Sequence, residues 1–102
     1  MKKAETAATA RELEEIPNVG PRIADDLRQL GIQSPSQLCG RDPYAMYDNL
    51  CAVTGVRHDP CLLDTLIAAV RFMEGGPVVP WWVFTPDRKR EMAARRPASP
   101  AR

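Results

Sequence analysis

The residues best suited to do chemistry lie at positions 16–24, which read Ile-Pro-Asn-Val-Gly-Pro-Arg-Ile-Ala. Pro17 disfavours continuation of a preceding helix, and Pro21 suits the first position of a new helix, where no N–H is required. Asn18 and Gly20 enter left-handed backbone conformations at the lowest cost. This spacing predicts two helices joined by a tight turn.

A turn of this kind can bind an anion. The backbone N–H groups around Val19, Gly20 and Arg22 would converge on one phosphate at the start of the second helix, where the helix dipole favours negative charge. The guanidinium of Arg22 would add a charge-assisted hydrogen bond. Two carboxylates, Asp25 and Asp26, follow in the same helix and oppose this interpretation. A turn that only packs helices or meets another protein is therefore the alternative.

The turn resembles the loop of the helix-hairpin-helix family, whose usual pattern is apolar-x-Gly-apolar-Gly. Ile16, Val19 and Gly20 match this pattern. Asn18 replaces the first glycine and tolerates the same left-handed backbone. Over residues 11–90 the chain resembles the small bacterial helix-hairpin-helix proteins grouped as the "pathogenicity locus" family. The segments that carry this wider resemblance are Gly40-Arg41-Asp42-Pro43, Asp59-Pro60-Cys61-Leu62-Leu63-Asp64 and Pro80-Trp81-Trp82. That family has no established activity, so the resemblance implies a fold more than a function.

Five short helices are predicted, most of them begun by a capping residue and ended by glycine. They cover residues 9–16, 21–30, 34–40, 42–55 and 59–75. Thr9 and Glu12 would form a capping box that opens the first helix. Apolar residues lie nearly all round the last helix, which predicts that it is central and buried. Residues 42–75 repeat the helix-turn-helix outline of the first hairpin and would form a degenerate second copy.

The expected fold class is all-α, a compact five-helix domain. Prolines interrupt the one β-rich segment, residues 78–84, which predicts an extended aromatic segment laid across the helices. Thr85-Pro86 predicts one more helix start, leading into a basic C-terminal helix and tail. The resemblance implies that the helices form a degenerate tandem helix-hairpin-helix, SAM-like arrangement. We divide the chain into a flexible N-terminus (1–8), a helix-hairpin-helix domain (9–87) and a basic C-terminal tail (88–102).

The formal net charge of +1 conceals an uneven distribution. Residues 11–87 carry six basic against eleven acidic side chains, a net charge of −5, whereas residues 88–102 carry six basic side chains against one, a net charge of +5. Arg88, Lys89 and Arg90 of the tail would hold a nucleic-acid backbone through counterion release. A solvated tail that aids solubility is the alternative.

Trp81 and Trp82 have two interpretations. Exposed rings would give a platform for stacked bases or for a docking protein partner. An adjacent pair at the end of a small domain is more often split, with one ring sealing the core and the other partly exposed. We expect at least one of the two rings to seal the core.

Metal binding has little support in the sequence. Cys39, Cys51 and Cys61 form no Cys-x-x-Cys pair, and only His58 lies close to one of them, so we predict no metal site and no cofactor. A helix N-terminus can lower the pKa of a thiol, but Asp59 opposes that shift at Cys61, and we expect a buried, inert thiol.

Catalysis has equally little support. The chain has one histidine, no Ser-His-Asp set and no glycine-rich nucleotide loop. Asp42, Asp59 and Asp64 are better explained as helix caps and surface groups. A small core would also leave little room for an extruded base. We therefore expect a protein that is not an enzyme.

The expected function is sequence-independent binding of a DNA backbone through the hairpin loop (Asn18, Val19, Gly20, Arg22) together with the basic tail. A non-enzymatic accessory factor in DNA repair or processing is the corresponding role, and the alternative is a protein–protein interaction module that does not bind DNA. No apolar run reaches membrane-spanning length, no signal peptide opens the chain, and the odd number of cysteines fits reduced thiols, so we expect a cytoplasmic protein. The sequence leaves the oligomeric state, the pathway and the choice of DNA or RNA open.

Overall fold

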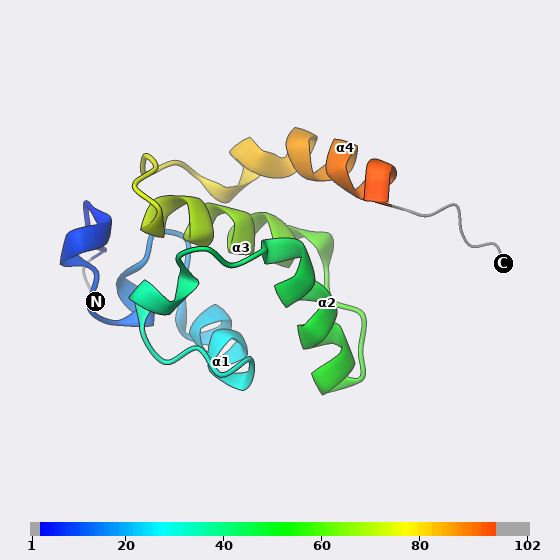
Figure 1. Cartoon of the computed structure of the whole chain (residues 1–102), viewed down its shortest axis with the longest axis horizontal. Coiled ribbons are helices and arrows are strands. Elements are labelled where there is room, and N and C mark those ends of the chain that lie inside the picture. The colour runs from blue at the N-terminus through cyan, green and yellow to red at the C-terminus, as the bar shows by residue number, and fades with distance from the viewer. Residues whose placement is uncertain (1–2, 96–102) are drawn as a thin grey trace, which may run out of the picture.

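The computed structural model describes residues 3–95, and this part of the chain is all-helical, without strands (Figure 1). The all-α class expected from the sequence is confirmed. The ends of the predicted flexible N-terminus and basic tail, residues 1–2 and 96–102, lie outside the described residues. The α-helices are α1 (Pro21–Gln29), α2 (Pro43–Thr54), α3 (Pro60–Met73) and α4 (Thr85–Arg95). The 3₁₀ turns are η1 (Ala7–Thr9), η2 (Leu13–Glu15), η3 (Pro35–Leu38) and η4 (Trp81–Phe84).

Helix α3 is the centre of the fold. Every side chain from position 62 to 70 is buried, as the nearly continuous apolar sequence predicts. Figure 1 shows α4 along one side of α3, with α1 and α2 on the other side. The core therefore forms around α3. The elements α2, α4, η1, η3 and η4 pack against α3, whereas α1 packs against α2 and η2.

The predicted starts of α2 and α3 are confirmed. The Asp42 side chain accepts a hydrogen bond from the N–H of Tyr44 (2.9 Å). The Asp59 side chain accepts one from the N–H of Cys61 (2.8 Å). Gly55 ends α2 in the left-handed conformation, with φ of 74°. These local signals set where α2 begins and ends and where α3 begins.

The predicted helix over residues 9–16 is wrong, because only the 3₁₀ turn η2 forms there. The Glu15 side chain accepts hydrogen bonds from the N–H groups of Arg11 (2.7 Å) and Glu12 (2.9 Å). The capping box of this turn joins Glu12 to Glu15, rather than Thr9 to Glu12. A segment this short before a proline has too few helical hydrogen bonds to offset nucleation.

The expected count of five α-helices fails at a second place, because residues 34–40 form only the 3₁₀ turn η3. The predicted extended segment 78–84 is half correct. Its first part has no regular structure, but the N–H of Val83 donates to the carbonyl of Pro80 (3.1 Å) and residues 81–84 turn into η4. This turn carries Phe84 into the core, where only 9% of it is exposed.

A buried ion pair fastens α4 to α3. The carboxylate of Asp64, in the middle of α3, is fully buried. Arg88 of α4 donates to it from Nε (2.8 Å) and Nη2 (3.3 Å), and the Thr85 hydroxyl donates a third hydrogen bond (2.6 Å). The hydrogen bonds that Arg88 donates to Asp64 raise the pKa of the Arg88 guanidinium. The expectation that Asp64 is a cap or surface group is therefore wrong, because its charge holds two helices together.

Removal of Arg88 should destabilise the fold strongly, because the charge of Asp64 would remain buried without its partner. We expect Arg88→Ala to lower the free energy of unfolding in urea by about 3–5 kcal/mol. Lys89→Ala, at the exposed neighbour, is the matched control and should stay within about 0.5 kcal/mol of the wild type. The double variant Asp64→Leu/Arg88→Met should recover most of the loss. A small effect of Arg88→Ala would contradict the structural role of the pair.

Candidate functional site

The turn between η2 and α1 has the conformation that its sequence predicts at two positions. Asn18 takes a φ of 73°, the one positive value at a non-glycine residue among residues 3–95. Its side-chain amide donates to the carbonyl of Val79 (2.8 Å), which ties the turn to the segment before η4. Val19 is fully buried, and its N–H donates to the carbonyl of Ile16 (3.0 Å). The turn is therefore anchored from inside.

Gly20 differs from the expectation that it takes left-handed backbone. Its φ of −93° and ψ of −176° are extended, and it is the N-cap of α1, followed by Pro21 at the first helical position. A Cβ at Gly20 would meet no atom within 4 Å. Glycine is thus not required here by the backbone or by packing within the chain, but it leaves one face of the backbone open to a close approach.

The start of α1 presents unused backbone donors. The first helical hydrogen bond runs from the N–H of Ala24 to the carbonyl of Gly20 (2.9 Å). The N–H groups of Gly20, Arg22 and Ile23 precede that bond, and no side chain within residues 3–95 caps the helix. Arg22 is itself exposed. An anion at this position would receive several N–H donors and one guanidinium.

Two further basic side chains lie at the turn. The Nζ atom of Lys3 donates to the carbonyls of Val19 and Glu14, which places a positive charge over the turn. Arg28 pairs with Glu14 (3.0 Å) and with Asp25 (3.1 Å). A hollow of about 460 Å³ lies between Lys3 and Arg28. Sequence reasoning missed Lys3, because nothing in the sequence links it to the turn.

The two acidic residues of α1 differ in their surroundings. Asp25 is exposed, and Arg28 partly neutralises it. Asp26 is only 9% exposed, and no donor within residues 3–95 lies at hydrogen-bond distance from its carboxylate. Burial raises the pKa of Asp26, while the positive charges of His58 and Arg22 lower it and Asp25 raises it further. Asp26 lines a hollow of about 240 Å³ between α1 and the start of α3.

The basic residues of α4 are largely paired with carboxylates. Arg88 was expected to contact phosphate, but it is bound to Asp64 and its side chain is 13% exposed, so we correct that assignment. Arg90 is exposed and pairs with Asp87. Lys89 is exposed. Fewer positive charges of this helix are therefore available to a ligand than its composition indicates.

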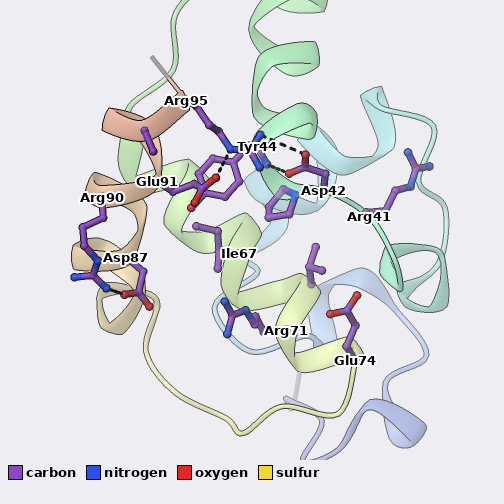
Figure 2. A pocket seen from close by; sticks show the side chains of 13 residues that line it. Arg41, Asp42, Tyr44, Ile67, Arg71, Glu74, Asp87, Arg90, Glu91 and Arg95 are labelled. Atoms are coloured by element: carbon purple, nitrogen blue, oxygen red, sulfur yellow. Dashed lines mark hydrogen bonds and ion pairs between the residues drawn. The ribbon is translucent and has the colours of Figure 1, made fainter. Parts of the chain in front are cut away.

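Figure 2 shows the cavity of about 680 Å³ beside α4, where Arg95 lies against Tyr44. The guanidinium of Arg95 is 4.3 Å from the ring centroid of Tyr44 and pairs with Glu91 (2.6 Å). Four arginines and four carboxylates line this cavity, so their charges balance. The cavity is large but offers no net charge that would select an anion or a cation.

The two tryptophans are split, as expected. Trp81 is partly buried against the core, whereas Trp82 is 60% exposed. The rings meet edge to face, with centroids 5.6 Å apart. Val78 and Val83 are also at least half exposed, so Trp82 belongs to an apolar stretch of surface.

The expectation of a buried thiol at Cys61 is wrong, because Cys61 is exposed. A hydrogen bond with the Asp59 side chain raises the pKa of the thiol, in the direction that the sequence predicts. The Cys39 thiol donates to the carbonyl of Met73 (3.2 Å). No group of three or more His, Cys, Asp or Glu side chains that could hold a metal ion occurs in the described part of the chain.

Comparison with known proteins identifies the family. The family model described as "Pathogenicity locus" (Cdd1) matches residues 6–90. The chain belongs to this family. It is 43% identical over 88 residues to the mitomycin resistance protein McrB of Streptomyces lavendulae, a match that covers 86% of this chain and 84% of that protein. No solved structure matches the chain significantly. Among residues 3–95, no helix has the length and apolar character needed to cross a membrane.

The buried carboxylate of Asp26 should make stability depend on pH. Because its pKa is raised on folding, the folded state holds the proton more tightly, and stability should fall as pH rises from the unfolded pKa of about 3.9 through the folded value. In urea unfolding between pH 4 and pH 7, Asp26→Asn should gain stability relative to the wild type as pH rises. Asp25→Asn, at the exposed neighbour, is the control. A constant difference between Asp26→Asn and the wild type would contradict this assignment.

Proposed function

We propose that this protein binds a nucleic-acid backbone at the turn before α1, in the manner of a helix-hairpin-helix motif. The observation that carries the proposal is the set of N–H groups of Gly20, Arg22 and Ile23, which have no acceptor within residues 3–95 and lie beside an open face of Gly20. Such donors at a helix N-terminus bind phosphate. They carry no information on base sequence, so duplex DNA would be bound without sequence preference.

The absence of a long first helix does not weaken the proposal. Phosphate would be bound by the turn and by α1, and both are held firmly by the buried Val19 side chain and by the hydrogen bond from Asn18 to Val79. The 3₁₀ turn η2 needs only to lead the chain into the turn before α1. We therefore propose a shortened hairpin, in which η2 replaces the first helix and α1 is the second.

Charge at the turn also supports phosphate binding. Asp25 weakened the hypothesis at the level of sequence, but its pairing with Arg28 reduces its repulsion. Lys3, which donates to the carbonyl of Val19, and the exposed Arg22 at the start of α1 add positive charge near Gly20. Lys89 and Arg90 of α4 remain in the proposal as secondary contacts, whereas Arg88 does not.

We propose a non-enzymatic role, because the turn offers hydrogen-bond donors rather than a nucleophile or a proton-transfer group. The relative in Streptomyces lavendulae is named for mitomycin resistance, and the two proteins are similar over most of both chains. We therefore infer a related protective role, carried out by binding nucleic acid. A survival assay on mitomycin, with the wild type and Gly20→Ser expressed in a sensitive host, tests this role.

The alternative is a protein-interaction module. The exposure of Trp82, together with that of Val78 and Val83 in the same short segment, favours it, because exposed apolar surface often marks a protein interface. This alternative predicts that Trp82→Ala abolishes the function in cells while the turn variants do not.

Gly20→Ser gives the sharpest test, because it should change stability and binding in opposite directions. A serine at the N-cap would accept a hydrogen bond from the start of α1 and stabilise the protein by about a few tenths of a kcal/mol. That hydrogen bond would engage a backbone N–H group that the phosphate would otherwise accept from. We expect binding of fluorescent duplex DNA, measured by anisotropy at low salt, to weaken about tenfold, as the loss of a charge-assisted hydrogen bond predicts. Unchanged binding would exclude the turn as the contact.

Arg22→Ala tests the electrostatic part of the contact. Loss of one phosphate contact should weaken binding and lower the dependence of log K on log salt by about one unit. Arg41→Ala removes an exposed arginine that lines the cavity beside α4, far from the turn in sequence, and is the matched control. A wild-type protein that binds neither duplex nor single-stranded DNA at low salt would refute the proposed function.

A further inference from the structure

The hollow between α1 and the start of α3 adjoins the proposed phosphate site. Arg22 and Ile23, which supply backbone donors at the start of α1, also line this hollow. Asp26 lies one helical turn further along α1, and Trp81 and His58 complete the lining from η4 and from the connection before α3. A group attached to a phosphate at the turn would therefore reach the hollow directly.

The carboxylate of Asp26 is the unusual feature of this hollow. Asp26 as a residue is only 9% exposed, and its carboxylate has no hydrogen-bond donor within residues 3–95. Buried carboxylates in native proteins are normally paired, because an unpaired one destabilises the fold. A ligand that donates hydrogen bonds to Asp26 would supply the missing partner.

When its ring is neutral, His58 adds a second acceptor. The hydroxyl of Thr54 donates its only proton to the carbonyl of Leu50 (2.8 Å), so at its contact with Nε2 of His58 (2.9 Å) it must accept. Nε2 therefore carries the proton, and in the neutral ring Nδ1 is an acceptor. The Tyr47 hydroxyl donates to the backbone carbonyl of His58, which fixes the position of this residue.

Thr65 is a third residue of the hollow that offers a hydrogen-bond acceptor. Its hydroxyl donates to the carbonyl of Cys61 (3.1 Å), which leaves only acceptor capacity toward the hollow. Asp26, His58 and Thr65 therefore offer acceptors to a ligand that carries N–H donors. Trp81 adds an indole that suits a flat ring. The volume of about 240 Å³ is below the range of about 300–1,000 Å³ usual for drug-sized ligands, but it accommodates one flat ring system.

We propose that this hollow takes one unpaired, amino-bearing nucleobase, guanine above the others, from a strand whose phosphate lies at the turn. Guanine offers two adjacent N–H groups on its Watson–Crick edge, which match the two oxygens of Asp26 in a bidentate pair. Its ring stacks on Trp81, as unpaired bases do on aromatic side chains. The inference rests on the proposed function, since the turn holds the phosphate of the same nucleotide.

A single-base comparison tests the inference. The probes are a labelled dT tract and the same tract with one central dG, measured by anisotropy at low salt. Thymine has no amino group, so we expect the dG strand to bind the wild type at least fivefold more tightly. A tract with inosine in place of guanine, which lacks the 2-amino group, should fall between the two.

The variants separate the two contacts. Asp26→Asn should abolish the preference for the dG strand and leave binding of the dT tract within twofold of the wild type. Gly20→Ser should weaken both strands and leave their ratio unchanged. Trp81→Leu should reduce the preference, whereas Trp82→Leu, at the exposed ring beside it, should retain it. Circular dichroism checks that each variant is folded.

The outcomes distinguish this inference from the proposed function. Equal binding of the two strands by the wild type, or a preference that survives Asp26→Asn, overturns the base site while the phosphate contact stands. Failure of the wild type to bind either strand removes both. A preference for the dG strand that is lost with Asp26→Asn supports the base site.

Discussion

The rest of the structure depends on the buried contact of Asp64 with Arg88 and Thr85. Helix α4 has no fully buried residue of its own. This ion pair and the turn η4 before it fix its position on α3, together with Met92 against the core and Arg95 against Tyr44. A carboxylate in the middle of α3 would be strongly unfavourable without the three hydrogen bonds it receives. Thr85 directly follows η4, so the same contact places Trp81 beside the hollow. The carbonyl of Val79, just before η4, accepts the hydrogen bond from Asn18 that anchors the turn.

The two buried carboxylates of this protein serve different purposes. Asp64 is surrounded by donors from another helix, and its charge is neutralised within the fold. Asp26 is nearly as buried but lies at the edge of an open hollow, without a donor among residues 3–95, and burial raises its pKa. The contrast is the physical basis for treating Asp64 as structural and Asp26 as a group that acts on a ligand.

Local signals predicted most of the fold. The caps Asp42 and Asp59, the left-handed Asn18 and the apolar sequence of α3 each depend on a few neighbouring residues, and all four are confirmed. The errors at Arg88 and at Lys3 arose because residues distant in the sequence decide those contacts. The pairing of Arg88 with Asp64 spans 24 positions, and the contact of Lys3 with the turn spans 16. The residues of the hollow come from α1, α3 and η4, so its existence follows only from the packing of those elements.

The pairing of charges also changes how a nucleic acid would be held. Composition predicted a strongly positive C-terminal segment, and five phosphate contacts of that kind would give a steep dependence on salt. Within α4, however, Arg88, Arg90 and Arg95 each pair with a carboxylate, and only Lys89 among the basic residues of this helix has none within ion-pair distance. Binding of nucleic acid through the overall positive charge of α4 would therefore be weak. Under the proposed function, directed donors at one phosphate and acceptors for one base would hold a short stretch of strand through geometry, which tolerates salt better than counterion release does. An acidic domain can bind nucleic acid in this way, because only the few atoms at the contact need to be complementary.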